Sequence, residues 1–220
     1  IDYDMTGVER DGEIPDAAIH GGGIEPLTGE LAEAIAGDKH NFYVFQGLCS
    51  REIDALRIPA SRYDEMRLRA LLDRGQAALS LEGTDDEAEI VGVGGQNRRL
   101  RGIMRETLEA AGWDAGKLSG VMAPHDPALF FNRPERGGVQ LELSRGVRAA
   151  MIDGPLTDFS WESEARWNEH FHTFVDVVRA SLERYLVELN ADLDRTMDRF
   201  ERTTDAFPPS MRDADHQHEE

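Results

Sequence analysis

The sequence predicts an α/β fold of three layers (αβα), with helices on both faces of a mixed, mostly parallel central sheet. Short apolar segments typical of strands alternate with segments whose apolar residues recur at helical spacing, and glycine or proline separates them. The chain has 220 residues, of which 40% are hydrophobic, which is enough to bury one sizeable core. Strands are predicted at residues 16–20, 41–45, 55–58, 77–81, 90–93 and 139–143.

Helices are predicted where apolar residues repeat every three or four positions. Most of these segments end at a glycine, the residue that most often follows the last helical turn. In chain order they are residues 27–36 (ending at Gly37), residues 64–72 (ending at Gly75), residues 100–111 (ending at Gly112) and a long C-terminal helix from residue 161 to residue 200.

A single domain is expected over residues 1–206, because no internal repeat interrupts the alternation. Residues 207–220 contain two prolines followed by charged and polar residues, and lack apolar periodicity. They are expected to form a disordered acidic tail.

The chain is strongly acidic: 24 Lys and Arg residues against 43 Asp and Glu residues give a formal net charge of −19. This charge excludes nucleic acid and anionic membrane surfaces as partners, because they carry the same sign. Lys39 and Lys117 are the only lysines. A folded, Asp- and Glu-rich, lysine-poor chain is typical of halophilic proteins. The alternative is an ordinary acidic protein from an arginine-rich genome.

Cysteine count and hydropathy exclude two further classes of protein. Cys49 is the only cysteine, so neither an intramolecular disulfide nor a Cys-rich zinc module can form. No apolar run reaches about 18 residues, so no membrane-spanning segment is expected. A cytoplasmic location is the working expectation, although the first residue, Ile1, leaves a trimmed leader open. The sequence predicts no oligomeric state.

The motif HGGGIE (residues 20–25) follows the first predicted strand. His20 then lies at the carboxyl end of a strand, where open α/β sheets place their binding sites. The glycines let the chain turn so that Glu25 can lie beside His20, and a His–Glu pair suits a catalytic zinc. The same loop also suits phosphate or an oxyanion at the start of the next helix, or a tight turn with a capping Glu25.

The motif GGVQLELSRGVR (residues 137–148) contains the last predicted strand. Because side chains alternate along a strand, Gln140 and Glu142 share one face and the apolar residues share the other. A polar pair on an inner face must be hydrogen-bonded or functional. Glu142 is therefore a candidate catalytic residue, and an ion pair with Arg145 or Arg148 is the structural alternative.

Together these motifs resemble those of the poly-γ-glutamate hydrolase family, zinc enzymes with a carboxypeptidase-like α/β fold known from phages and bacteria. The resemblance covers about 130 residues, and its motifs keep the family's order and spacing. They are IHGGGIEP (residues 19–26), NFYVFQGL (residues 41–48), YDE (residues 63–65), NR (residues 132–133) and GVQLELSRGVR (residues 138–148).

The resemblance implies a zinc-carboxypeptidase-like site. His20 and Glu25 would be metal ligands, and Glu142 would be the general base that takes a proton from water and passes it to the leaving amine. A substrate rich in carboxylates needs fixed cations, and arginine offers bidentate donors for them. The expected substrate-binding residues are Asn132, Arg133 and Arg145.

Two positions depart from the family pattern. Glu82 stands where the third metal-binding histidine is expected, and Arg57 replaces another family histidine. A His20, Glu25 and Glu82 set would still bind a divalent cation, but its oxygen donors shift the preference from zinc toward manganese or iron. His125 is an alternative third ligand, and loss of the metal and of activity is the other outcome that these departures allow.

The predicted function is a metal-dependent amidohydrolase that cleaves γ-glutamyl amide bonds in an anionic peptide or polymer. One alternative is a non-catalytic relative that keeps the fold for binding. The other is a deacylase of N-acyl amino acids on the same fold.

We predict that the protein loses structure at low salt, because a net charge of −19 on one small domain is unscreened there. Circular dichroism should give a melting temperature that rises between dilute buffer and about 1 M salt, where the Debye length falls to about 3 Å. An unchanged melting temperature would contradict the halophilic interpretation.

Overall fold

The computed structural model describes residues 2–48, 53–117, 126–156 and 163–205. Two compact units are present, Ile1–Leu182 and Glu183–Glu220. The single domain predicted over residues 1–206 stays a prediction. Cys49, His125 and the predicted tail lie outside the described residues.

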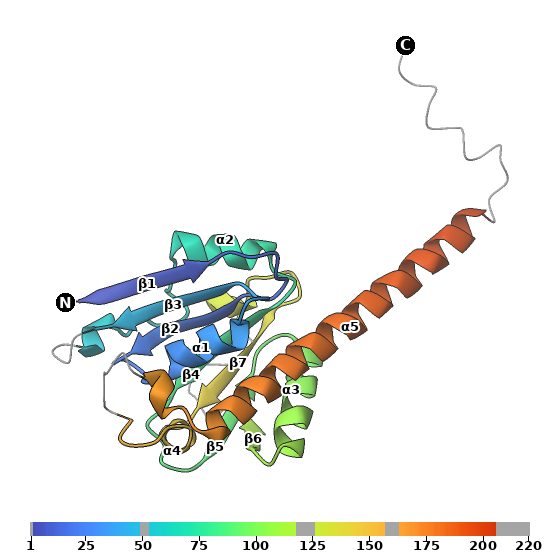
Figure 1. The fold of residues 1–220 in the computed structure, drawn as a ribbon. Helices are drawn as coiled ribbons and strands as arrows, with labels where there is room; N and C mark the ends of the chain where they lie inside the picture. The colour runs from blue at the N-terminus through green and yellow to red at the C-terminus, as the bar shows by residue number, and fades with distance from the viewer. Residues whose placement is uncertain (1, 49–52, 118–125, 157–162, 206–220) are drawn as a thin grey trace. The chain divides into compact units, whose positions relative to one another are not determined.

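The first unit is built on a seven-stranded sheet with the order β1-β3-β2-β4-β7-β5-β6 (Figure 1). The pairs β1–β3 and β5–β7 are antiparallel, and the other four neighbouring pairs are parallel. The mixed, mostly parallel sheet is thereby confirmed. Its strands are β1 (Tyr3–Val8), β2 (Asp16–Gly22), β3 (Phe42–Gly47), β4 (Ala78–Gly83), β5 (Ile90–Gly94), β6 (Asp114–Lys117) and β7 (Gly138–Leu143).

The helices alternate with the strands along the chain, as predicted. The α-helices are α1 (Thr28–Ala36), α2 (Met66–Arg74), α3 (Arg98–Ala110), α4 (Arg145–Ala150) and α5 (Glu169–Asp205). The described residues also contain the short 3-10 helices η1 (Ile53–Leu56), η2 (Phe130–Asn132) and η3 (Ser163–Arg166). No helix among the described residues is long and apolar enough to cross a membrane.

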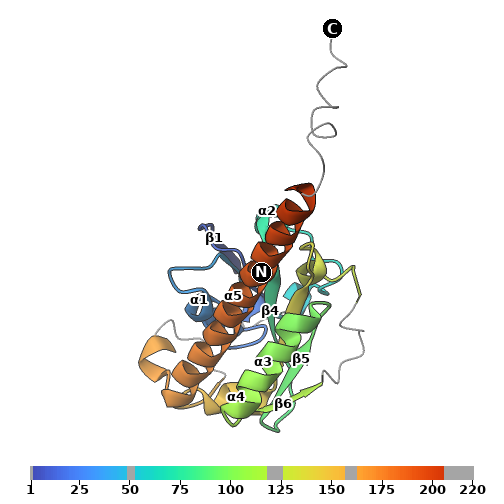
Figure 2. The same cartoon turned by 90° about the vertical axis from the view of Figure 1, so that its right-hand side faces the viewer.

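Helices cover both faces of the sheet. Tyr43 and Phe45 of β3 belong to the apolar core that also contains the buried leucines of α2, whereas Val44, between them, meets Gly29 of α1. Alternate residues of one strand therefore contact helices on opposite faces, which is the three-layer arrangement. Residues 169–182 of α5 pack on the α1 face of the sheet, where α3 also lies (Figure 2). There the Ser181 and Thr107 hydroxyls are hydrogen-bonded.

The strand predicted at residues 55–58 is wrong. This segment is η1 followed by an irregular turn, and Leu56 alone is buried. The physical reason is that β3 already has β1 on one side and β2 on the other, so residues 55–58, which follow β3 in the chain, cannot pair beside it.

Besides the 3-10 helix η2, two short strands and one short α-helix were not predicted. β1 and β6 are edge strands whose sequences, YDMTGV and DAGK, lack an apolar run. α4 has only six residues, and it is defined by its cap, because the Ser144 side chain accepts a hydrogen bond from Val147 N. Edge strands and single-turn helices form through their neighbours, so periodicity does not reveal them.

The chain changes direction across the sheet between β2 and β4. After β2 it goes through α1 to β3 on one side, and after β3 it goes through α2 to β4 on the other. β2 and β4 pair only at Asp16–Leu79 and Ala17–Ser80, near their starts. Ligands of open α/β sheets bind at such a switch point, beyond the carboxyl ends of the strands. His20 and Glu82 lie near the carboxyl ends of these two strands.

Candidate active site

His20 is aimed by an irregularity in β2. The register with β3 shifts between Ala18 and Gly21, so that β2 contains one extra residue there. His20 Nε2 lies 2.9 Å from the carbonyl oxygen of Ile58. Because a carbonyl only accepts, Nε2 carries the hydrogen, and in the neutral ring Nδ1 keeps its lone pair. Nδ1 lies 3.2 Å from Glu25 Oε1.

His20, Glu25, Glu82 and Glu142 lie together at the switch point of the sheet, and the place where they meet is called the crevice below. Glu25 is at the centre of its contacts, and the Glu25 side chain is only 4% exposed. Its Oε1 faces His20 and also accepts a hydrogen bond from Arg57 Nη1. Its Oε2 accepts a hydrogen bond of 2.6 Å from Gly83 N, in the last residue of β4. One carboxylate therefore links the loop after β2, the turn after η1 and the end of β4.

The loop between β2 and α1 is held tightly by its own backbone. The N–H groups of Gly23, Ile24 and Glu25 donate to Gly47, Gly21 and His20 carbonyls. Because these N–H groups already donate to carbonyl oxygens, they are not available to bind a phosphate group. Leu27 has a φ of 78° at the start of α1, and no side chain caps this helix. The capping role considered for Glu25 is therefore wrong, because its side chain bonds to β4 instead.

Two further carboxylates lie beside Glu25. Glu82 of β4 and Glu142 of β7 are direct partners in the parallel register, so both side chains point to the same face. Glu82 Oε1 is buried without a hydrogen-bond partner. Within the described residues no ion pair joins Glu142 to Arg145 or Arg148, since Arg145 contacts Glu87 and Arg148 contacts carbonyl oxygens.

Arg148 of α4 is a buried cation that donates hydrogen bonds to carbonyl oxygens in three segments at the carboxyl ends of the strands. Its Nη1 donates to Pro26 O (2.9 Å), its Nη2 to Thr84 O (2.7 Å) and its Nε to Leu143 O (3.2 Å). Each of these carbonyls follows a candidate site residue by one or two positions along the chain. The sequence suggests Arg148 only as an ion-pair partner for Glu142. Its role in joining three loops depends on contacts between distant parts of the chain.

The pKa values of the titratable groups in the crevice are shifted, because several negative charges lie close together there. Burial, with the neighbouring charges of Glu25 and Glu142, raises the pKa of Glu82 from its ordinary 4.5 to about 7. Burial and the charge of Glu25 also raise the pKa of Glu142. For His20, burial lowers the pKa, but the contacts with Glu25 and Ile58 outweigh it and the net direction is upward.

The donor types in the crevice fit a divalent cation. His20 Nδ1 and Glu82 Oε1 are both buried without a hydrogen-bond partner, and a cation beside Glu25 would satisfy both. Within the described residues, however, no three His, Cys, Asp or Glu side chains are grouped closely enough to hold a metal ion. In the structure the positive charge beside Glu25 is the Arg57 guanidinium, which forms an ion pair with it.

The structure does not bring all predicted substrate-binding residues to this crevice. Asn132 accepts hydrogen bonds from Gln96 N and Gly138 N, at the start of β7, while Glu142 lies near its end. Gly138 and Glu142 are four residue steps apart along β7, which corresponds to about 13 Å. Arg133 pairs with Asp73 at the end of α2.

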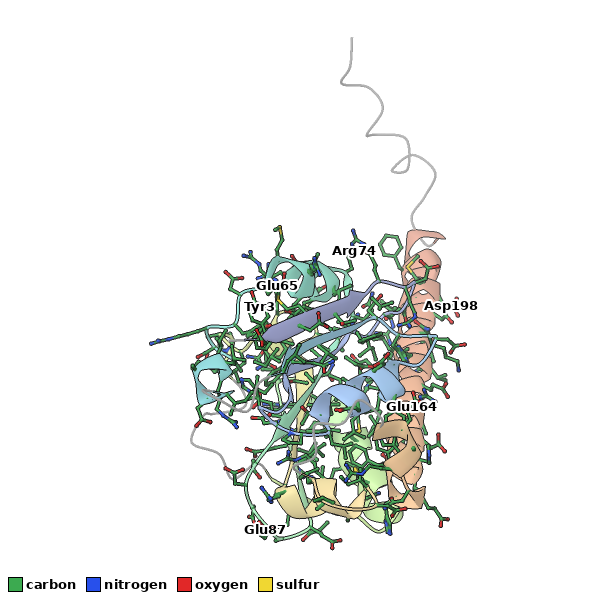
Figure 3. All side chains as sticks on the ribbon, turned by 60° about the vertical axis from the view of Figure 1, so that its left-hand side comes forward. Tyr3, Glu65, Arg74, Glu87, Glu164 and Asp198 are labelled. Atoms are coloured by element: carbon green, nitrogen blue, oxygen red, sulfur yellow. The ribbon has the colours of Figure 1, made fainter. Side chains whose placement is uncertain are left out.

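Asn132 and Arg133 instead line a cavity of about 740 Å³ on the α2 face of the sheet. Its walls also include the arginines Arg62 and Arg69. Residues 61–64, which are part of this lining, follow Ile58 closely in the chain. Arg145 lies elsewhere, at the start of α4, paired with Glu87, whose side chain is labelled in Figure 3. Substrate binding by these three residues stays a prediction.

The sequence family follows from a comparison with known proteins. The family model described as poly-gamma-glutamate hydrolase matches residues 1–177, which is most of the chain. The chain belongs to this family. The resemblance on which the fold and the site were predicted is thereby confirmed.

Individual relatives agree with this assignment. UPF0714 protein YndL of Bacillus subtilis (strain 168) is 31% identical over 182 residues, covering 80% of this chain and 70% of that protein. A structure of a bacteriophage poly-gamma-glutamate hydrolase superposes with a TM-score of 0.77 at 25% identity, covering 84% of this chain and 89% of the phage chain. A zinc-free apo structure of YndL gives 0.74 at 30% identity, covering 83% and 90%. The three-layer αβα fold is confirmed, and it is the fold of these poly-gamma-glutamate hydrolase and YndL structures.

We predict that the metal-free protein loses stability as the pH rises from about 5 to 8. Glu82 binds its proton more tightly in the folded state, where its pKa is about 7, than in the unfolded chain, where it is near 4.5. As the pH rises, the unfolded state therefore loses that proton first. The free energy of unfolding falls by about 3 kcal/mol over this pH window. The raised pKa of His20 acts in the same direction, because its stabilisation is lost above its folded pKa.

The measurement is the melting temperature in chelator and constant molar salt, at pH 5.5 and 8.5, for the native protein and for Glu82→Gln. The neutral glutamine should remove a large part of the decline. A native protein that is equally stable at both pH values would show that Glu82 ionises without cost.

Proposed function

We propose that this protein is a metal-dependent amidohydrolase that cleaves γ-glutamyl amide bonds in an anionic peptide or polymer. The observation that supports it best is the convergence of His20, Glu25, Glu82 and Glu142 at the switch point of a sheet that belongs to this family. The family match itself establishes only that the chain belongs to a hydrolase family, and the metal and the substrate are part of the proposal.

His20, Glu25 and Glu82 would hold the metal. His20 contributes Nδ1, whose lone pair is directed into the crevice by the Nε2 contact with Ile58 O. Glu25 and Glu82 contribute carboxylate oxygens, which favour manganese or iron over zinc more than a second histidine would. When bound, a divalent ion supplies Lewis-acid polarisation of the amide carbonyl.

Glu142 would be the general base. Its carboxylate is half-buried, makes no ion pair among the described residues and shares a face with Glu82. Its raised pKa brings it closer to the pH at which a carboxylate both takes and returns a proton efficiently. Glu142 takes the proton of the attacking water and delivers it to the leaving amine nitrogen.

The substrate class is argued from the arginines. A chain with a net charge of −19 repels an anionic polymer at long range, so local cations have to bind it. Arg133, with Arg62 and Arg69, faces the cavity on the α2 side, and Arg145 stands near the carboxyl end of β7. Molar salt screens the long-range repulsion and leaves these short-range contacts in place.

A second candidate function is favoured by one contact, the bond from Arg57 to Glu25. If this cation occupied the crevice permanently, the protein would bind γ-glutamyl ligands without hydrolysing them. Metal analysis of protein purified at molar salt separates the two functions. A panel of γ-glutamyl, α-glutamyl and N-acyl substrates then tests the reaction class, and preferential cleavage of N-acyl substrates would identify the deacylase instead.

We predict that Glu142→Gln lowers hydrolysis of a γ-glutamyl substrate by about 10²–10⁴-fold, the usual contribution of a general base. Metal affinity and the melting temperature should change little, because glutamine keeps the shape of the side chain. Glu135→Gln, which removes the same charge from an exposed turn, is the matched control. Near-normal turnover by Glu142→Gln would exclude Glu142 as the base.

We predict that Glu82→His binds zinc more tightly and raises any zinc-dependent amidase activity, because an imidazole nitrogen replaces a harder oxygen donor. Zinc titration against a competing chelator measures this directly. Glu82→Gln, which has neither the charge nor the nitrogen, should bind more weakly than the native protein. If zinc affinity is the same in all three proteins, Glu82 is not a ligand.

A further inference from the structure

Arg57 enters the crevice from the solvent side. Its side chain is 42% exposed, whereas Glu25, its partner, is 4% exposed. The guanidinium bonds twice to one short segment, through Nη1 to Glu25 Oε1 and through Nη2 to Ile24 O at 2.9 Å. An exposed arginine is rehydrated easily on leaving, whereas a buried carboxylate that loses its cation is strongly destabilised.

The same turn also holds His20. Ile58, the next residue, offers the carbonyl oxygen that fixes the His20 ring. Two consecutive residues after η1 therefore contact both members of the His20–Glu25 pair, one through a backbone carbonyl and one through a guanidinium. This places Arg57 at the pair itself and not at the rim of the crevice.

Arg57 and a divalent ion would need the same oxygen. Glu25 Oε2 is committed to Gly83 N, so Oε1 is the atom left for a cation that also contacts His20 Nδ1. Arg57 Nη1 already occupies Oε1. Two cations on one carboxylate oxygen repel each other strongly in a partly dry site.

We infer that Arg57 is a built-in counter-cation that competes with the divalent metal for Glu25. In the metal-free protein it neutralises the buried Glu25, and metal binds only when the guanidinium withdraws into solvent. The apparent metal affinity is then the intrinsic affinity multiplied by the fraction of molecules in which Arg57 has withdrawn. This inference rests on the metal site of the proposed function.

The experiment compares the native protein with Arg57→Gln in molar salt. Two quantities are measured, manganese and zinc affinity by titration against a chelating dye, and the melting temperature in chelator. Arg67→Gln is the matched control, because Arg67 is an exposed arginine on α2 and loses the same charge. Arg57→Lys keeps the charge but not the two-pronged contact.

Arg57→Gln should bind metal about tenfold tighter or more, if less than about a tenth of the native molecules have Arg57 withdrawn. Its melting temperature in chelator should fall, and saturating metal should restore it. Arg57→Lys should lie between the native protein and Arg57→Gln, and Arg67→Gln should match the native protein in both measurements.

The outcomes separate this inference from the proposed function. A native protein that binds metal and hydrolyses substrate, with Arg57→Gln binding no tighter than Arg67→Gln, would overturn the inference and leave the function standing. Metal binding by Arg57→Gln alone would support the inference and overturn metal-dependent hydrolysis by the native protein. Absence of metal binding in every variant would overturn both.

Discussion

Three carboxylates, those of Glu25, Glu82 and Glu142, meet at one crevice of the sheet, and their mutual repulsion has to be compensated by cations. Burial strengthens this repulsion, because the carboxylates lose much of the screening that water provides. In the structure the compensation comes from Arg57 on Glu25, from the buried Arg148 and from the upward pKa shifts of Glu82 and His20, which favour bound protons. A divalent cation would supply the same compensation from a single point.

The fold brings these carboxylates together and also supplies the contacts that hold them in place. The parallel strands β2, β4 and β7 end at the same edge, so residues near their carboxyl ends are forced together. The irregularity in β2 aims His20, and Arg148 joins the segments that follow the site residues. Precise placement of ligands and base is what a hydrolytic site needs, because misplacement of the reacting groups by about 1 Å can cost about 10²-fold in rate.

Much of this could be predicted from local sequence, and the rest depends on distant contacts. His20 and Glu25 lie on one loop, so their proximity was predictable from HGGGIE. The side-chain face of Glu142 followed from strand alternation. By contrast, the bond from Arg57 to Glu25 joins residues 32 positions apart, and Arg57 itself lies in the segment wrongly predicted as a strand. Asn132 and Arg133 match a family motif, but they precede β7 in the chain, and Asn132 bonds to Gly138 at the start of that strand, whereas Glu142 lies near its end.

The central claim is that Glu25 binds one cation at a time, either Arg57 or a divalent metal. The most direct measurement is a crystal structure of the native protein grown in molar salt with manganese, with the ion located by anomalous scattering. The account predicts an ion coordinated by His20, Glu25 and Glu82, with the Arg57 guanidinium withdrawn from Glu25. An ion located elsewhere, or an ion at Glu25 with Arg57 still bonded to the same oxygen, would contradict it.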